Sequence, residues 1–95
     1  MTIASAAKMA NRRPRPQINS AYEAMLPLLR ELRKEAGLTQ RALAPSLKLD
    51  HTQIAKSEVG IRRIDPVEFA RWAKACGVDP VEAYTRLWKL IERRV

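Results

Sequence analysis

Residues 39–60 read TQRALAPSLKLDHTQIAKSEVG, and the spacing of polar and apolar residues in this stretch decides how the chain folds. Thr39 precedes a short helix that ends at Leu47. The Thr39 hydroxyl can accept a bond from a free N–H group in the first turn of that helix. Asp50 precedes a second helix over residues 51–58 in the same way, with Gln53 at the capping-box position. Only residues 48–50 separate the two helices, so they must cross steeply and leave one face of the second helix projecting from the domain.

The projecting helix is too polar for a core helix. Ile54 is its only large apolar residue, so something other than a protein core must satisfy the polar face. A DNA major groove admits one α-helix, and reading base edges needs donors and acceptors near the N-terminus of that helix. We therefore predict a helix-turn-helix whose base contacts come from His51, Thr52, Gln53 and Lys56.

Cations lie close to this helix along the chain. Arg62 and Arg63 follow it, and Arg41 lies at the start of the preceding helix, so all three are candidate phosphate contacts. The whole chain holds 18 basic and 10 acidic residues among 95, with a net charge of +8 and a pI near 10.4. Such an excess implies a polyanionic partner, either nucleic acid or an anionic membrane surface.

Length and hydropathy exclude other classes of protein. A chain of 95 residues forms one small domain. No apolar run approaches the ~18–20 residues that a membrane span needs. The N-terminal stretch carries its charges after a weak apolar patch, which is the reverse of a secretory signal. We therefore expect a cytoplasmic protein.

The residues that usually carry catalysis or bind metals are scarce. With a single cysteine and a single histidine, the chain has neither an internal disulfide nor a zinc-ligand set. No nucleophile or orienting acid is placed to form a catalytic triad with His51. Cys76 falls on an inward stripe with Phe69, Trp72 and Ala73, so we assign it to the core. We predict no enzyme activity, no catalytic residue, no metal and no cofactor.

The chain divides near residue 20. Residues 1–19 hold four cations, no acid and the proline-rich run RRPRP, so they are predicted to form a flexible basic tail, with or without contact to a DNA minor groove. From Ser20 onward the pattern is helical throughout, with no strand or hairpin signal. The fold class predicted for residues 20–95 is therefore all-α, with five helices.

The other three helices are located by their end signals. A helix over about 21–36 begins after Ser20 and ends at Gly37, and Pro27 either kinks it or marks where its regular part starts. The sequence DPVE occurs at 65–68 and again at 79–82, with Asp as N-cap and Pro at the first helical position. The last helix, over about 80–94, follows the second copy.

The stretch from about Leu28 to Val78 resembles the phage-repressor and Cro-like family, also called XRE-type, through LRELRKEAGLTQRALA, QIAKSEVG and FARWAKACGV. The resemblance implies base contacts near the start of the helix 51–58 and a backbone-gripping loop after it. It also implies that Gln40 holds a phosphate and braces the first residue of that helix. Finally, it implies a structural ion pair between Arg33 and Glu58.

Three residues depart from the family pattern. Lys48 replaces a glycine in the turn, and a positive φ there would cost on the order of 1 kcal/mol. Pro45 lies inside the first helix of the pair, where it removes one hydrogen bond. Ser57 stands where a larger apolar residue is usual, so either Trp72 or another neighbour fills the space or a cavity remains. These departures affect how the helices dock more than the fold itself.

The last helix has an unusually wide apolar arc. Tyr84, Trp88, Ile91 and Val95 share one stripe, which begins at Val81 and is widened by Leu87 and Leu90. Either the surplus surface forms a homodimer contact, which we predict for those four residues, or the whole arc packs on the chain's own helices. A dimer would suit an inverted-repeat site with half-sites about one helical turn apart.

Together these features predict a sequence-specific double-stranded DNA-binding protein that regulates transcription, as a repressor or autoregulator. Two alternatives remain open. An antitoxin of a toxin–antitoxin pair would bind its own operator and also neutralise a partner protein. A chromosome-coating protein would bind DNA regardless of sequence.

Overall fold

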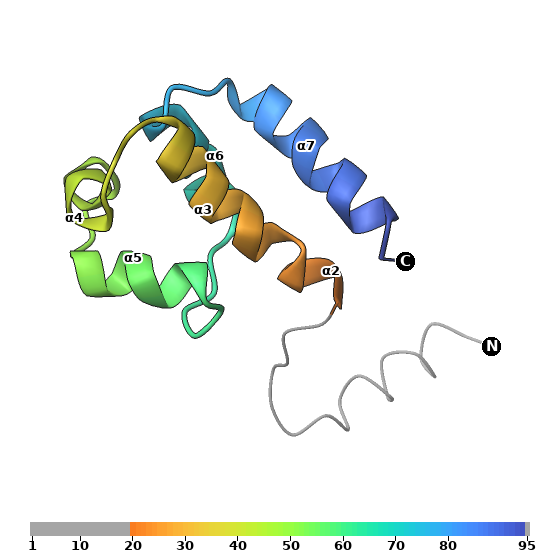
Figure 1. Ribbon diagram of the computed structural model, residues 1–95, viewed down its shortest axis with the longest axis horizontal. Helices are drawn as coiled ribbons and strands as arrows, with labels where there is room; N and C mark the ends of the chain where they lie inside the picture. Colours follow the sequence, from red (N-terminus) through yellow and green to blue (C-terminus); the bar gives the residue numbers. More distant parts are fainter. Residues whose placement is uncertain (1–19, 95) are drawn as a thin grey trace.

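The computed structural model describes residues 20–94, so the predicted tail over residues 1–19 and the dimer residue Val95 lie outside the described residues. The elements, in chain order, are α2 (Ser20–Glu23), α3 (Met25–Glu35), α4 (Gln40–Leu43), the 3₁₀ turn η1 (Ala44–Leu47), α5 (His51–Glu58), α6 (Pro66–Ala75) and α7 (Pro80–Glu92). The predicted all-α class is confirmed for this part of the chain (Figure 1). The five predicted helices correspond to α2 with α3, α4 with η1, α5, α6 and α7.

Side-chain caps start four of these helices. The Thr39 hydroxyl accepts a bond from the Ala42 backbone N–H, and the carboxylates of Asp65 and Asp79 do the same at α6 and α7. Asp50 and Gln53 form the full capping box at α5. The first helix was predicted to begin after Ser20, whereas Ser20 is itself the first residue of α2.

The two interior prolines divide the helices that contain them. The first helix is interrupted at Ala24, one turn before Pro27, because the proline ring clashes with the preceding turn and supplies no N–H group. Pro45 falls in the first turn of η1, where the missing N–H group costs little. The second helix therefore continues past Leu43 as a tighter 3₁₀ turn.

The turn before α5 has the geometry that normally needs a glycine. Lys48 has a φ of 57° and ψ of 38°, which is the left-handed region. Its N–H group donates to Pro45 O at 3.0 Å, and the next N–H group, of Leu49, donates to Ala44 O at 3.0 Å. These bonds satisfy the end of η1 and offset part of the strain at Lys48.

The hydrophobic core gathers around α3, with α5, α6 and α7 all packed against it (Figure 1). Trp72 is fully buried at the centre, and its indole N–H donates to Leu29 O at 3.1 Å. Cys76 joins this core, as predicted. The fully buried apolar side chains are Leu28, Leu29, Leu32, Leu43, Ile54, Phe69, Trp72, Ala73 and Ala83. Within residues 20–94, no helix is long and apolar enough to cross a membrane.

Candidate nucleic-acid interface

Helix α5 has a buried side and an accessible side. Ile54, Ser57 and Glu58 face the protein and are at most 2% exposed. Thr52 and Lys56 are exposed on the other side. The remaining α5 residues, His51, Gln53 and Ala55, are half-buried between the two. We call the side formed by His51, Thr52, Gln53 and Lys56 the reading surface.

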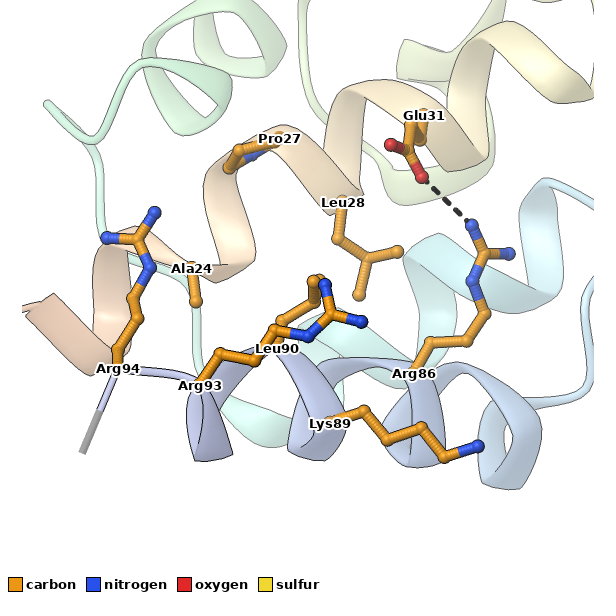
Figure 2. A pocket seen from close by; sticks show the side chains of 9 residues that line it. All are labelled: Ala24, Pro27, Leu28, Glu31, Arg86, Lys89, Leu90, Arg93 and Arg94. Carbon is orange, nitrogen blue, oxygen red and sulfur yellow. Dashed lines mark hydrogen bonds and ion pairs between the residues drawn. The ribbon is translucent and has the colours of Figure 1, made fainter.

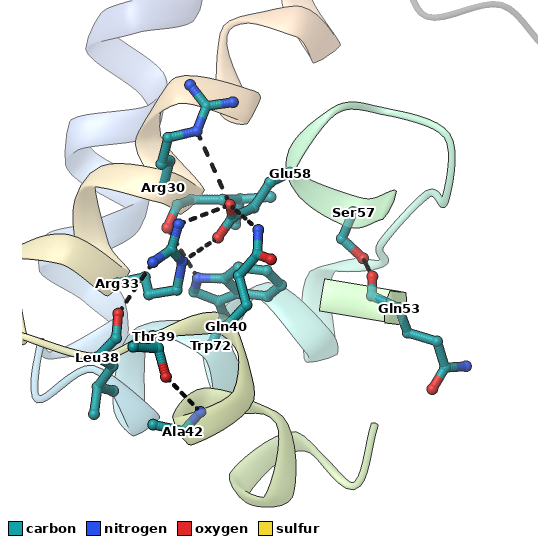
Figure 3. A network of polar contacts seen from close by, with 11 residues as sticks. Arg30, Arg33, Leu38, Thr39, Gln40, Ala42, Gln53, Ser57, Glu58 and Trp72 are labelled. Carbon is teal, nitrogen blue, oxygen red and sulfur yellow. Dashed lines mark hydrogen bonds and ion pairs between the residues drawn. The ribbon is translucent and has the colours of Figure 1, made fainter. Parts of the chain in front are cut away.

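Gln53 contributes to the reading surface only in part. Its Oε1 atom accepts a bond from the Asp50 N–H at 3.0 Å, and the Asp50 carboxylate accepts from the Gln53 N–H at 2.8 Å. The side chain extends away from the core in Figure 3. Because the oxygen is held by the cap, only the amide NH₂ group of Gln53 is left to face a ligand.

A buried ion pair fixes the C-terminal end of α5 to α3. The Arg33 guanidinium donates to both Glu58 carboxylate oxygens, from Nε at 2.6 Å and from Nη2 at 3.0 Å (Figure 3). Arg33 also donates to Leu38 O at 3.0 Å. The hydrogen bonds to Glu58 raise the pKa of Arg33 above its ordinary value. The pair implied by the resemblance is therefore present, and it is almost fully buried.

Gln40 joins the same network. Its Nε2 atom donates to Glu58 Oε1 at 3.1 Å, so it links the start of α4 to the end of α5 (Figure 3). The expected brace is thus made to the last residue of α5 and not to its first. Arg30 adds a second cation 3.9 Å from the same oxygen. Glu58 therefore connects α3, α4 and α5 through one carboxylate.

A second ion pair holds the other side of α5, and sequence reasoning missed it. Arg62 donates to both oxygens of Glu68 on α6, at 2.7 and 2.8 Å. Its Nη1 atom also donates at 3.1 Å to the hydroxyl of Ser57, which in turn donates to Gln53 O. Hydrogen bonding to Glu68 raises the pKa of Arg62. Arg62 is thus the neighbour that satisfies the buried Ser57, and a polar residue at that position was the signal for it.

Arg63 is placed differently from Arg62. Its guanidinium lies 4.2 Å from the centre of the Tyr22 ring, which is a cation–π distance. The Tyr22 hydroxyl accepts a bond from the Ile64 N–H at 3.1 Å, so the loop after α5 is fixed to α2. Arg63 and Arg41 are both exposed. Of the four predicted phosphate contacts, these two have accessible side chains, whereas Gln40 and Arg62 already bind carboxylates within the domain.

The apolar arc of α7 is divided by the packing of the helix. Leu87 and Leu90 pack against the core, as the second interpretation of the arc expected. Trp88 is 56% exposed and Tyr84 37%, while Ile91 is half-buried. The Tyr84 ring still contacts Phe69, with ring centres 4.6 Å apart. The Tyr84 hydroxyl also donates to the Pro66 carbonyl, so Tyr84 packs on α6 and Trp88 is the most exposed of the three described dimer residues.

Metal-binding clusters are absent from residues 20–94, where no group of three or more His, Cys, Asp and Glu side chains could hold an ion. Cys76 is buried, and desolvation raises the pKa of its thiol to about 11. At neutral pH this thiol is protonated and serves as a small apolar group.

Comparison with known proteins agrees with this geometry. A family model described as a helix-turn-helix domain matches residues 27–84. The chain is similar to a solved structure described as an XRE-family like protein from Pseudomonas syringae pv. tomato str. DC3000. The sequence identity is 31% and the TM-score is 0.68, and the match covers 90% of this chain and 96% of the other. A search of curated proteins finds no match. The chain belongs to the XRE-type helix-turn-helix family and is, at the level of that family, a DNA-binding transcription regulator.

Proposed function

We propose that this protein binds a specific double-stranded operator and represses transcription from it, including transcription of its own gene. The observation that carries the proposal is the division of α5. Its inner side is fixed by Ile54 and by two arginine–glutamate pairs, while its outer side offers polar groups on a single helix, which a major groove can admit. A rigid helix with an accessible polar side suits base reading, because readout needs side chains held in register with base edges.

The base contacts proposed are His51, Thr52 and Lys56, with the Gln53 amide as a fourth. Lys56 carries the charge that favours the O6 and N7 acceptors of guanine. His51 and Thr52 lie in the first turn of α5, which is the part of a recognition helix that enters the groove most deeply. These residues give sequence preference and are not the main source of affinity.

Phosphate contacts are proposed for Arg41, on α4, and for Arg63, in the loop after α5, both of which are exposed. Gln40 and Arg62 are proposed as weaker phosphate contacts, because their side chains are already bonded to Glu58 and Glu68. Each cation that contacts a phosphate releases about one counterion, so these residues set the salt dependence of binding.

The test is selection of bound sequences from random duplex DNA, followed by competition of the recovered site against scrambled duplex. A specific regulator should enrich one motif and prefer it over scrambled DNA by roughly a thousandfold or more. Footprinting on the DNA upstream of the gene then tests autoregulation. Equal affinity for both duplexes would instead identify a chromosome-coating protein.

We also propose that the operator is an inverted repeat bound by a homodimer. The strip of α7 that holds Tyr84, Trp88 and Ile91, extended in sequence to Val95, would pack against the same strip of a second copy, as two-fold symmetry requires. Trp88 is the proposed centre, because large aromatic side chains dominate interface energetics.

Replacing Trp88 with glutamate tests the dimer. We expect sedimentation to show monomers and operator affinity to fall, while the melting temperature of the monomer is retained, since Trp88 is more than half exposed. Val59→Glu is a matched control for assembly, because Val59 is 58% exposed at the C-terminal end of α5 and should leave the oligomeric state unchanged. A wild-type protein that is monomeric at working concentration would contradict the dimer.

A further inference from the structure

A cleft lies between α7 and the N-terminal half of α3, away from the proposed reading surface. Its volume is about 290 Å³. Glu31, at its edge, and Arg33, which holds α5, are two positions apart on α3 and so project from nearly opposite sides of that helix. The lining residues are Ala24, Pro27, Leu28, Glu31, Arg86, Lys89, Leu90, Arg93 and Arg94 (Figure 2).

The cleft has an apolar floor and a cationic rim. Pro27, Leu28 and Leu90 form the floor together with Ala24 (Figure 2). Four basic side chains and one acidic side chain complete the lining. The arrangement matches an amphipathic anion, with an apolar body over the floor and a charged head at the rim.

The cations of the rim differ in whether they form ion pairs with the chain's own carboxylates. Arg86 is paired with Glu31 at 3.1 Å and with Glu35 at 3.3 Å, and Arg94 lies 3.6 Å from Glu23. Lys89 and Arg93, in contrast, have no ion pair to any residue within 20–94. In Figure 2 the Arg93 side chain lies along Leu90, with its guanidinium toward Leu28. Arg93 is therefore the cation available to a ligand resting on the floor.

We propose that this cleft binds a small organic anion with an apolar body, of the class of medium-chain carboxylates. Its volume is near the lower limit of ligand pockets, about 300 Å³, which suits a small molecule and is too little for a partner helix. Residues 1–19 contain four cations and no acid, so they do not supply the anion. The bidentate fork of Arg93 fits a carboxylate head.

Such a ligand contacts both α3 and α7, so its binding stabilises their packing. A molecule that binds the folded state and not the unfolded one stabilises the folded state by RT ln(1 + L/Kd), where L is the free ligand concentration, so it raises the melting temperature. Because α7 also carries the strip proposed for assembly, the cleft gives a small molecule access to the helix that would hold the dimer together.

The experiment titrates the full 95-residue chain with octanoate, below the concentration at which it forms micelles, and follows calorimetry and backbone amide NMR shifts. We expect saturable binding at one site, with the largest shifts at Ala24, Leu28 and Leu90. Octanol has the same body without the charge, and acetate has the charge without the body, so both should bind much more weakly.

Arg93→Gln provides the decisive variant. Arg93 is exposed, so the change should not disturb folding, and loss of a charge-assisted contact should weaken octanoate binding by about tenfold. Arg71→Gln, an exposed arginine on α6 remote from the cleft, should bind octanoate as the wild type does. The proposal is overturned if octanol binds as well as octanoate, if the two variants behave alike, or if the shifts lie outside the cleft.

Discussion

Two arginine–glutamate pairs hold α5, and they differ in burial more than in chemistry. Arg33 and Glu58 meet at 2.6 and 3.0 Å, with side chains that are 11% and 2% exposed. Arg62 and Glu68 meet at 2.7 and 2.8 Å, with side chains that are 28% and 20% exposed. Both are bidentate, so geometry alone would rank them as equals.

The difference in burial gives the two pairs different consequences. Taking the first pair out of water costs free energy that only its full set of partners offsets, so removal of one partner leaves an uncompensated charge in the core. Water and salt still reach the second pair, so its net contribution is small. The buried pair therefore sustains folding, whereas the half-buried pair mainly orients the loop after α5.

Glu58→Ala should have the largest effect on stability. It leaves Arg33 buried without its carboxylate and removes the acceptor of Gln40, so we expect a loss of about 3–5 kcal/mol in the free energy of unfolding. Urea denaturation measures the loss. Glu92→Ala, at the exposed end of α7, is the control and should change stability by less than about 0.5 kcal/mol. A Glu58→Ala protein as stable as the control would show that the buried pair does not sustain the fold.

Cys76 reports on how dry the surroundings of the buried pair are. Burial raises the pKa of its thiol from 9.0 to about 11, while the charge of Arg33 lowers it and that of Glu58 raises it. The folded state therefore keeps this proton after the unfolded state has lost it. The contribution of this thiol to the free energy of unfolding is therefore fully present below pH 9, and it is lost as the pH rises toward 11.

The measurement is the difference in unfolding free energy between wild type and Cys76→Ala across this pH range. The wild type should lose more stability than the variant on going from pH 8 to pH 11. The variant lacks the thiol, and the two proteins share all their other titratable groups. Parallel curves would mean that water reaches the thiol and that the region around Arg33 is less dry than its burial indicates.

Glu68→Ala should have the smallest effect on stability. We expect a loss of about 1 kcal/mol or less at low salt, and a smaller loss at 1 M salt, where exposed charges are screened within ~3 Å. The loss caused by Glu58→Ala should change little with salt. Paired denaturation curves at the two salt concentrations distinguish the pairs, and an equal salt response would remove the distinction between them.

Much of the fold could be predicted from the sequence because it depends on local signals. Thr39, Asp50, Asp65 and Asp79 cap helices through contacts three residues away, and such spacings are visible in the chain. The pair Arg33–Glu58 was predicted as well, although its partners are 25 residues apart, because the family resemblance carries long-range information that spacing does not.

The remainder depended on packing across the fold. Arg62 and Arg63 have different roles, and two adjacent arginines in a sequence do not reveal this. The difference arises because Arg62 lies on the side of the loop that faces Ser57 and Glu68. The brace of Gln40 also shifted to the far end of α5, where Glu58 offers an oxygen not fully used by Arg33. The apolar arc of α7 was identified, but only the packed structure separates Leu87 and Leu90 from the outward Trp88.

The proposed function requires that the outer side of α5 reads bases while the exposed arginines hold the DNA backbone. The most direct measurement compares Lys56→Ala and His51→Ala with Arg63→Ala on operator and on scrambled duplex, over a range of salt. The first two should lose roughly 1–3 kcal/mol of discrimination between the duplexes. Arg63→Ala should instead weaken both duplexes alike and lower the salt slope by about one. If Lys56→Ala and His51→Ala lose affinity equally for operator and scrambled DNA, α5 is not the reading helix.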